Sequence, residues 1–151
     1  MPTYDIVPAT LQHAIVLSTT MAKADRREIW ASSRATPFEA LRCGMEGEAF
    51  SGLVDGRPVC MFGVVPASIL GDTATVWMLG SNDLPKYAKP FLRRNRPWLR
   101  GVSSRYSVLF NFVDARNENA IKWLKWLGFT LAPAIPYGQD KLPFHPFELR
   151  S

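Results

Sequence analysis

Residues 108–129, VLFNFVDARNENAIKWLKWLGF, predict a buried strand that leads directly into a helix. The apolar run 108–113 is interrupted only by Asn111, which is typical of a strand that is mostly buried. Asp114 and Asn117 then offer side-chain oxygens to the free N–H groups of the helix that follows. The unit therefore indicates a fold that combines a sheet with helices.

The helix in this unit has one apolar face and a defined end. Apolar residues recur at spacing three from Ile121 to Leu127, and lysines occupy the opposite side. Gly128 can adopt the left-handed conformation that ends a helix, which allows Phe129 to fold back towards Leu124. The chain should then return as a strand.

The N-terminal part predicts a strand followed by helices. Residues 4–7 alternate as an edge strand does. Thr10 can cap a helical pattern over residues 11–33, with a break near Thr19. A Thr-Pro-Phe-Glu start at Thr36 predicts a second helix, because proline suits the first turn and glutamate completes a capping box.

The middle of the chain predicts three strands. Asp55-Gly56 lies between two apolar runs and is the strongest hairpin signal, joining strands near 49–54 and 58–65. A further strand is expected over residues 73–79. These three strands precede the unit at 108–129.

The segments on either side of that unit contain several prolines. Residues 84–105 are mostly helical in pattern, and we expect this helix to start near Pro90 and to be kinked or restarted at Pro97. The segment 130–151 predicts one or two strands at a sheet edge. The element order is strand, two helices, three strands, helix, strand, helix, strand, which is an α+β arrangement of a mixed sheet flanked by helices.

Composition limits the class of protein. Hydrophobic residues make up 47% and charged residues 21% of the 151 residues, as in a folded globular domain that needs no disulfide or metal. No apolar run approaches the roughly 20 residues that cross a bilayer. The N-terminus lacks a signal-like apolar core. We therefore expect a single domain over residues 1–151, without a membrane span, that stays where it is made.

Cysteine and histidine chemistry is not indicated. Cys43 and Cys60 have no partners at metal-ligand spacing, and Cys60 lies in an apolar run where a buried thiol is expected. His13 and His145 are far apart, and neither has a serine or cysteine in a recognisable nucleophile setting. A zinc site and a hydrolase triad are excluded, and a reducing cytosol fits both cysteines.

Positive charge is concentrated in one segment of a chain whose formal net charge is +5. No acidic residue occurs between Asp83 and Asp114. Such a segment attracts coenzyme phosphates, nucleic acid or an acidic protein surface, and a solvated helix face is the structural alternative. The cations in this interval are Lys86, Lys89, Arg93, Arg94, Arg96, Arg100 and Arg105.

The unit at 108–129 resembles the C-terminal signature of the GNAT acetyltransferase superfamily, V-x-x-x-N-x-x-A-I-x-x-Y-x-x-x-G-F. The tyrosine position, which supplies the acid for the departing thiolate in many members, is Leu124. Together with the segments WMLGSND and FLRRNRPWL, this unit resembles a narrower group within the superfamily, the small GNAT-like proteins of short-tailed bacteriophages. The resemblance covers about residues 75–130. It implies a location in the host cytoplasm or the virion. The matching residues are Val113, Asn117, Ala120, Ile121, Gly128 and Phe129.

The resemblance implies a GNAT-like fold, acetyl-CoA as acyl donor, and an amine-bearing acceptor or a host protein as partner. The Gly-rich phosphate loop of the family is missing here, so cations near the following helix would replace it. Trp77 and Leu79 can equally be strand core, and Asn117 can equally be a helix cap. The implied cofactor-binding residues are Met78, Leu79 and Gly80 for the thioester, Lys89, Arg93 and Arg94 for the phosphates, and Asn117 for the pantetheine arm.

Proton transfer would depend on a carboxylate. Asp83 and Glu28 are the candidates, together with Asp25, and Asn117 is carried over from the motif. Asp25 and Glu28 lie in an ADRRE helix turn, where pairing with the neighbouring arginines is the structural alternative. Candidates to replace the missing tyrosine are Tyr87, Tyr106 and Tyr137.

Two functions therefore stay open. The first is an N-acetyltransferase with a degenerate cofactor loop and no catalytic tyrosine. The second is a catalytically inactive GNAT-fold phage protein that acts in virion assembly or internal virion structure, or binds a host partner. Fold alone does not separate them.

Overall fold

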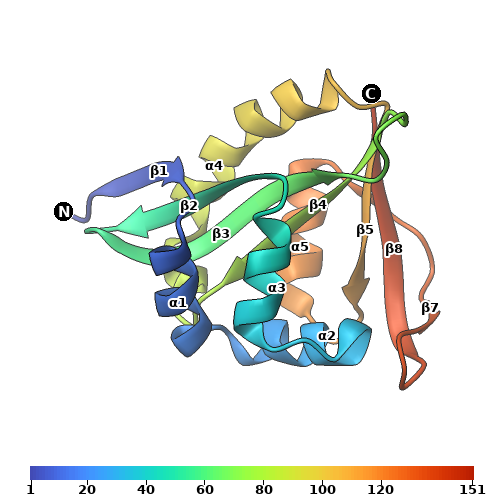
Figure 1. The fold of residues 1–151 in the computed structure, drawn as a ribbon, viewed down its shortest axis with the longest axis horizontal. Helices are drawn as coiled ribbons and strands as arrows, with labels where there is room; N and C mark the ends of the chain where they lie inside the picture. The colour runs from blue at the N-terminus through green and yellow to red at the C-terminus, as the bar shows by residue number, and fades with distance from the viewer.

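The computed structural model describes residues 1–151, in which five helices surround an eight-stranded mixed sheet (Figure 1). None of the helices combines the length and hydropathy of a membrane span. The elements are β1 (Tyr4–Pro8), α1 (Leu11–Thr20), α2 (Lys23–Ser33), α3 (Pro37–Gly44), β2 (Glu48–Val54), β3 (Arg57–Pro66), β4 (Thr73–Gly80), α4 (Leu84–Ser103), β5 (Val108–Asp114), α5 (Glu118–Leu127), β6 (Thr130–Leu131), β7 (Ile135–Tyr137) and β8 (Leu142–Arg150).

The sheet has the strand order β1-β2-β3-β4-β5-β8-β6, with β7 paired to β8. β1 to β4 are successive antiparallel neighbours, whereas β4 and β5 are parallel. The predicted hairpin is confirmed: Asp55 and Gly56 join β2 to β3 with φ angles of 50° and 79°. β1 is the predicted edge strand.

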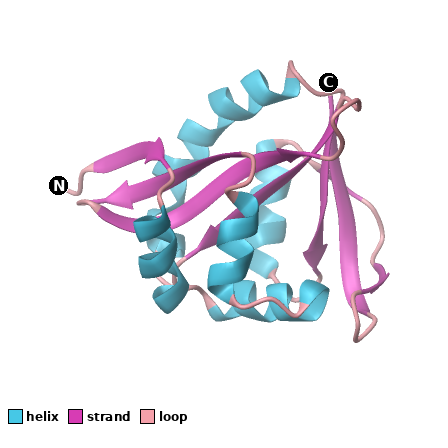
Figure 2. Cartoon of the chain, in the orientation of Figure 1, coloured by secondary structure: helices cyan, strands magenta, loops and turns pink.

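Helices cover both faces of the sheet (Figure 2). On one face, Leu17 of α1 and Leu41 of α3 pack against Met61 of β3. On the other face, Phe91 of α4 packs against Phe62, the next residue of the same strand. Successive strand residues point to opposite faces, so α1 to α3 lie on one side of the sheet and α4 and α5 on the other.

The predicted helix starts at Thr10 and Thr36, and the predicted break near Thr19, are confirmed. The Thr10 hydroxyl accepts from the His13 N–H, and the Thr36 hydroxyl accepts from the Glu39 N–H. The break near Thr19 separates α1 from α2, and Met21 between them forms a bridge with Ser81. This bridge brings the start of α2 to the end of β4.

Helix α4 differs from its prediction. It begins at Leu84 rather than near Pro90, and it continues through Pro97 as one element. A proline removes one hydrogen bond to the carbonyl four residues earlier. Those carbonyls belong to Lys86 and Arg93, which are exposed, so water can satisfy them. Buried residues recur along the whole helix and stabilise it against both prolines.

The C-terminal segment also differs from its prediction of one or two edge strands. It forms three strands, and β8 alone pairs with the whole of β5, from Val108 opposite Arg150 to Asp114 opposite Phe144. β6 and β7 are short and pair only with β8. Because β8 holds β5 on one side, the other side of β5 is where the sheet can open.

Candidate active site

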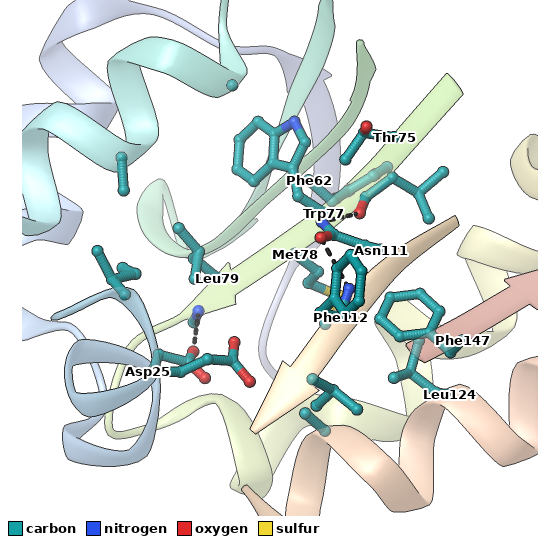
Figure 3. A pocket seen from close by; sticks show the side chains of 18 of the residues that line it. Asp25, Phe62, Thr75, Trp77, Met78, Leu79, Asn111, Phe112, Leu124 and Phe147 are labelled. Carbon is teal, nitrogen blue, oxygen red and sulfur yellow. Dashed lines mark hydrogen bonds between the residues drawn. The ribbon is translucent and has the colours of Figure 1, made fainter. Parts of the chain in front are cut away.

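β4 and β5 pair at their beginnings and then separate. Residues 73–75 pair with residues 108–110, and no pairing follows. Asn111 lies at the point of separation, where its Nδ2 donates to the Val76 carbonyl at 2.9 Å and its Oδ1 accepts from the Phe112 N–H at 2.8 Å (Figure 3). The sheet therefore has an opening that widens towards the ends of both strands.

A cavity of about 520 Å³ occupies this opening. It reaches both faces of the sheet, since Trp77 and Cys43 line it on the side of α3 while Asn95, Trp98 and Leu124 line it on the side of α4 and α5. Of its 31 lining residues, 21 are hydrophobic, so a molecule bound there would be largely removed from water.

The backbone of Met78 faces the opening. Val76, two residues before it, accepts from Asn111 across the gap, and Gly80, two residues after it, donates to Asp25. Backbone groups of alternate strand residues point in the same direction. The Met78 N–H is therefore directed between the separated strands, towards the cavity that this residue lines.

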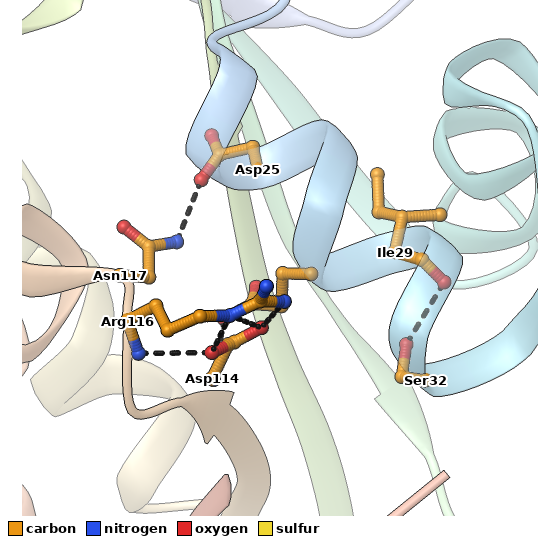
Figure 4. A network of polar contacts seen from close by, with 7 residues as sticks. Asp25, Ile29, Ser32, Asp114, Arg116 and Asn117 are labelled. Atoms are coloured by element: carbon orange, nitrogen blue, oxygen red, sulfur yellow. Dashed lines mark hydrogen bonds and ion pairs between the residues drawn. The ribbon is translucent and has the colours of Figure 1, made fainter. Parts of the chain in front are cut away.

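Two carboxylates of α2 connect the ends of the separated strands. Figure 4 shows one of these contacts, between Asp25 and Asn117. Asp25 Oδ2 accepts from the Gly80 N–H at 2.8 Å, and Asp25 Oδ1 accepts from Asn117 Nδ2 at 2.9 Å. Glu28 Oε1 accepts from the Asp114 N–H at 2.7 Å. Helix α2 thus holds β4, β5 and the start of α5 at the wide end of the opening.

Burial gives Glu28 an unusual proton affinity. Desolvation, with smaller contributions from the charges of Asp25 and Asp114, raises the Glu28 pKa to about 8, although the hydrogen bond from the Asp114 N–H opposes the shift. Desolvation also raises the pKa of Asp25, against the bonds from Gly80 and Asn117. Glu28 is therefore a carboxyl group that can exchange a proton near neutral pH.

Asp114 has the opposite behaviour. Burial acts to raise its pKa, but hydrogen bonds and charge from Arg116 outweigh burial and lower it. Its carboxylate binds Arg116 Nη2 at 2.7 Å rather than capping α5, so that part of the sequence prediction is wrong. Asn117 alone caps the helix, accepting from the Ala120 N–H at 3.4 Å. Asp114 thus keeps a negative charge beside Glu28.

The structure brings some of the predicted site residues together. Glu28, Met78, Leu79 and Gly80 line the cavity. Asn117 lies at its end, in a recess of about 40 Å³ that also includes Asp25 and Gly80. These residues form one connected site, which we call the β4–β5 site.

Other predicted residues lie outside the β4–β5 site. The Asp83 side chain is 58% exposed and faces Arg57 Nη2 at 3.7 Å. Lys89, Arg93 and Arg94 are exposed on α4 and do not line the cavity. Arg94 instead places its guanidinium 5.6 Å from the centre of the Tyr4 ring.

The connection between β4 and α4 offers no free amide for a phosphate. It contains only Ser81–Asp83, and Pro85 in the first turn of α4 has no N–H. The other N–H groups from Ser81 to Lys86 already have acceptors within the chain, so the family's loop of free amides has no counterpart here. The acceptors are Val59 O for Ser81, Thr20 O for Asn82, Ser81 Oγ for Asp83, Ser81 O for Leu84 and Asp83 O for Lys86, at 2.9 to 3.2 Å.

The predictions from sequence did not identify Asn95 and Trp98 as cavity residues, and they considered Trp77 only as strand core. Trp77 Nε1, Trp98 Nε1 and Asn95 Oδ1 are buried without a hydrogen-bond partner, and all three residues line the cavity. Such atoms normally find a partner, so three buried polar atoms without one are an unusual feature of the cavity wall. The available signal was Asn95, a polar residue within the buried stripe of α4.

The positions of the tyrosines and of Cys60 show which of these side chains can reach a molecule bound in the cavity. Of the three tyrosines predicted to replace the missing acid, only Tyr137 lines the cavity, where it stacks on Phe112 at 4.2 Å. The prediction of a buried Cys60 thiol is confirmed, and desolvation raises its pKa to about 12. No group of three or more His, Cys, Asp or Glu side chains is arranged to hold a metal ion.

Comparison with known proteins shows a likeness of fold. The sequence matches no family model and no curated protein. The GCN5-related N-acetyltransferase of Kribbella flavida matches with a TM-score of 0.72 at 12% identity, over 98% of each chain. The ribosomal-protein-S18-alanine N-acetyltransferase of Escherichia coli matches with a TM-score of 0.62 at 20% identity, over 99% of this chain and 94% of the other.

A third structure, yncA of Salmonella typhimurium with its cofactor acetyl-CoA, matches with a TM-score of 0.65 at 12% identity. The match covers 97% of this chain and 93% of yncA. The predicted fold class, a GNAT-like mixed sheet flanked by helices, is confirmed. The narrower resemblance to phage proteins stays a prediction.

Proposed function

We propose that this protein is a GNAT-fold acyltransferase that moves the acetyl group of acetyl-CoA to an amine at the β4–β5 site. The observation that carries the proposal is the separation of β4 from β5 after Thr75 and Phe110, with Glu28 in the opening. The acetyl-CoA in the yncA structure, which has the same fold, supports the choice of donor.

The Met78 N–H is the group placed to polarise the thioester. It faces an apolar cavity, where a hydrogen bond to a carbonyl is stronger than in water. As the amine attacks, negative charge develops on the carbonyl oxygen, and a preorganised N–H stabilises that charge. Acetyl-CoA supplies the activated acyl group in this chemistry.

Glu28 is the group placed to accept the proton. An amine acceptor arrives as an ammonium ion and must lose a proton before its nitrogen can attack. With a pKa of about 8, Glu28 lies near the value expected of an efficient general base. Glu28 takes one proton from the ammonium group, and the free amine then attacks. The N–C bond forms and the C–S bond breaks. Because Leu124 replaces the usual tyrosine, the second proton on nitrogen passes through water to the departing thiolate.

The structure offers a suitable site for the pantetheine arm of acetyl-CoA but not for its phosphates. The apolar cavity suits a pantetheine arm. The phosphate end has no loop of free amides. In addition, Asp25 already holds Gly80 and Asn117, which the resemblance assigns to the thioester and to the pantetheine arm. Binding therefore requires Asp25 to move or to share these donors, and the predicted contribution of the α4 cations to phosphate binding stays a prediction.

A non-catalytic role is the alternative. The hydrogen bonds of Asp25 and Glu28 support it, since they close the wide end of the opening from within the chain. In that case the sequence resemblance suggests a phage protein of virion assembly or internal virion structure, or one that binds a host partner, in the host cytoplasm or the virion. These assignments stay predictions.

Titration with acetyl-CoA, followed by calorimetry and by thiol release with a panel of amines, separates the two. For an enzyme we expect saturable binding and thiol release, and Glu28→Gln should keep binding while lowering kcat by about 100-fold. Asp83→Asn, on an exposed carboxylate outside the site, is the matched control and should keep full activity. Absence of binding at millimolar acetyl-CoA would reject the enzyme and leave the non-catalytic role.

A further inference from the structure

The cations of α4 and α5 have no carboxylate partners. The chain forms five ion pairs, and none involves a residue of either helix. α4 contains no acidic residue, and the single acidic residue of α5 is Glu118 in its first turn. The unpaired cations are Lys86, Lys89, Arg93, Arg94, Arg96 and Arg100 on α4, and Lys122 and Lys125 on α5.

Five of the α4 cations form a stripe along one side of the helix. At about 100° per residue, they fall within an arc of roughly 80° and extend over roughly 21 Å. Each is exposed, and none lines the cavity of the β4–β5 site. We call Lys86, Lys89, Arg93, Arg96 and Arg100 the basic stripe.

The basic stripe continues onto α5 through an aromatic contact. The Arg96 guanidinium lies 3.7 Å from the centre of the Trp126 ring, and Arg96 Nη2 donates to the Trp126 carbonyl at 2.7 Å. Trp126 is 41% exposed, although it is a large hydrophobic residue. Lys122 and Lys125 precede it by four and one positions on the exposed side of α5. Cations and an accessible indole therefore share one surface.

We infer that this surface binds single-stranded nucleic acid. A row of unpaired cations complements the repeated charges of a phosphate backbone. Arg96 covers one face of the Trp126 indole, and the part of the ring that stays exposed offers a platform on which an unpaired base can stack. An acidic protein surface would satisfy the cations but would give the exposed Trp126 no specific role. This inference does not depend on acetyl transfer, because the surface lies outside the β4–β5 site.

Fluorescence anisotropy of a labelled oligothymidylate, with the full chain over a range of salt concentrations, tests the inference. Binding should weaken with salt, and Arg93→Ala with Arg100→Ala should lower the affinity about tenfold and the salt slope by roughly 1.4, or about 0.7 per lost phosphate contact. Trp126→Ala should weaken binding about tenfold without changing the salt slope.

The matched control changes two arginines on the other side of the sheet. Arg26 on α2 and Arg42 on α3 are exposed and unpaired, so Arg26→Ala with Arg42→Ala removes the same charge. Affinity should then stay within about twofold. Circular dichroism melts verify that each variant is folded.

Four results would overturn the inference. Absence of binding at low salt is the first. Equal losses of affinity in the two double variants would mean that binding depends only on the net charge of the protein. Equal or stronger competition by duplex DNA or polyglutamate would assign the surface to another partner. Displacement of the oligonucleotide by stoichiometric acetyl-CoA would assign the cations to the cofactor.

Discussion

Asp25 and Asn117 are joined by a hydrogen bond of 2.9 Å across the wide end of the opening between β4 and β5. The other carboxylate oxygen of Asp25 takes the Gly80 N–H at 2.8 Å. One side chain thus occupies two donors that the sequence resemblance assigns to the cofactor. In the proposed enzyme, Asp25 and acetyl-CoA would compete for the same hydrogen bonds.

Removal of this competitor should tighten binding. Asp25→Ala frees Gly80 N–H and Asn117 Nδ2 and removes a negative charge, so the Kd for acetyl-CoA should fall about tenfold by calorimetry. The unliganded variant should lose about 1–3 kcal/mol of stability, because two donors lose their acceptor. Asp83→Ala, on an exposed aspartate, is the control for charge. Weaker binding by Asp25→Ala would mean that Asp25 holds the cofactor instead of excluding it.

Glu28 should make the protein less stable at high pH. Its pKa is about 8 in the folded chain against an ordinary value of 4.5, so the folded state binds more protons between these values. The stabilisation is full below the lower value and is lost as pH rises through the higher one. Urea unfolding of Glu28→Gln should therefore show a gain near pH 9 that exceeds its change near pH 5 by on the order of 4 kcal/mol, because each unit of pKa shift corresponds to about 1.4 kcal/mol. An equal gain at both pH values would contradict the assignment.

Leu124 offers a gain-of-function test. It lines the cavity at the position where the family signature has tyrosine. Leu124→Tyr should raise kcat for thiol release about tenfold, because a phenol can protonate the departing thiolate. Leu127→Tyr introduces the same side chain one turn later in the cavity wall and should give no gain. A rise in both variants would point to altered packing rather than proton transfer.

Gly101 and Gly128 both have room for a Cβ atom but differ in backbone conformation, so replacing each by alanine separates the effect of the φ angle from that of steric contact. A Cβ atom would meet nothing within 4 Å at Gly101 or Gly128, but Gly128 has φ of 102°. Gly128→Ala should lower the free energy of unfolding by about 1–2 kcal/mol, since the left-handed region disfavours side chains. Gly101→Ala, within α4, should raise it by about 0.5–1 kcal/mol. Thermal melts of both variants check the two signs.

The sequence alone was sufficient to predict the features whose hydrogen bonds join residues close together in the chain. The caps at Thr10 and Thr36, the Asp55-Gly56 turn and the stop at Gly128 each involve residues within a few positions of one another. The sequence missed the full length of α4, because proline can remain in a helix only where the freed carbonyls face water. That condition depends on which side of α4 packs against the sheet.

The candidate site was decided by tertiary structure. In sequence, Asp25 and Glu28 lie in a charged helix turn where surface pairing is the ordinary interpretation. The fold places this turn against the ends of β4 and β5. Three hydrogen bonds hold it there, and they join residues that are separated in the sequence by 55 positions (Asp25 and Gly80), 86 positions (Glu28 and Asp114) and 92 positions (Asp25 and Asn117). The sequence determined most of the elements and their order, because these follow from local hydrogen bonds and apolar periodicity. Only the packing of α2 across the opening decided which carboxylate is desolvated, since desolvation depends on neighbours that are distant in the chain.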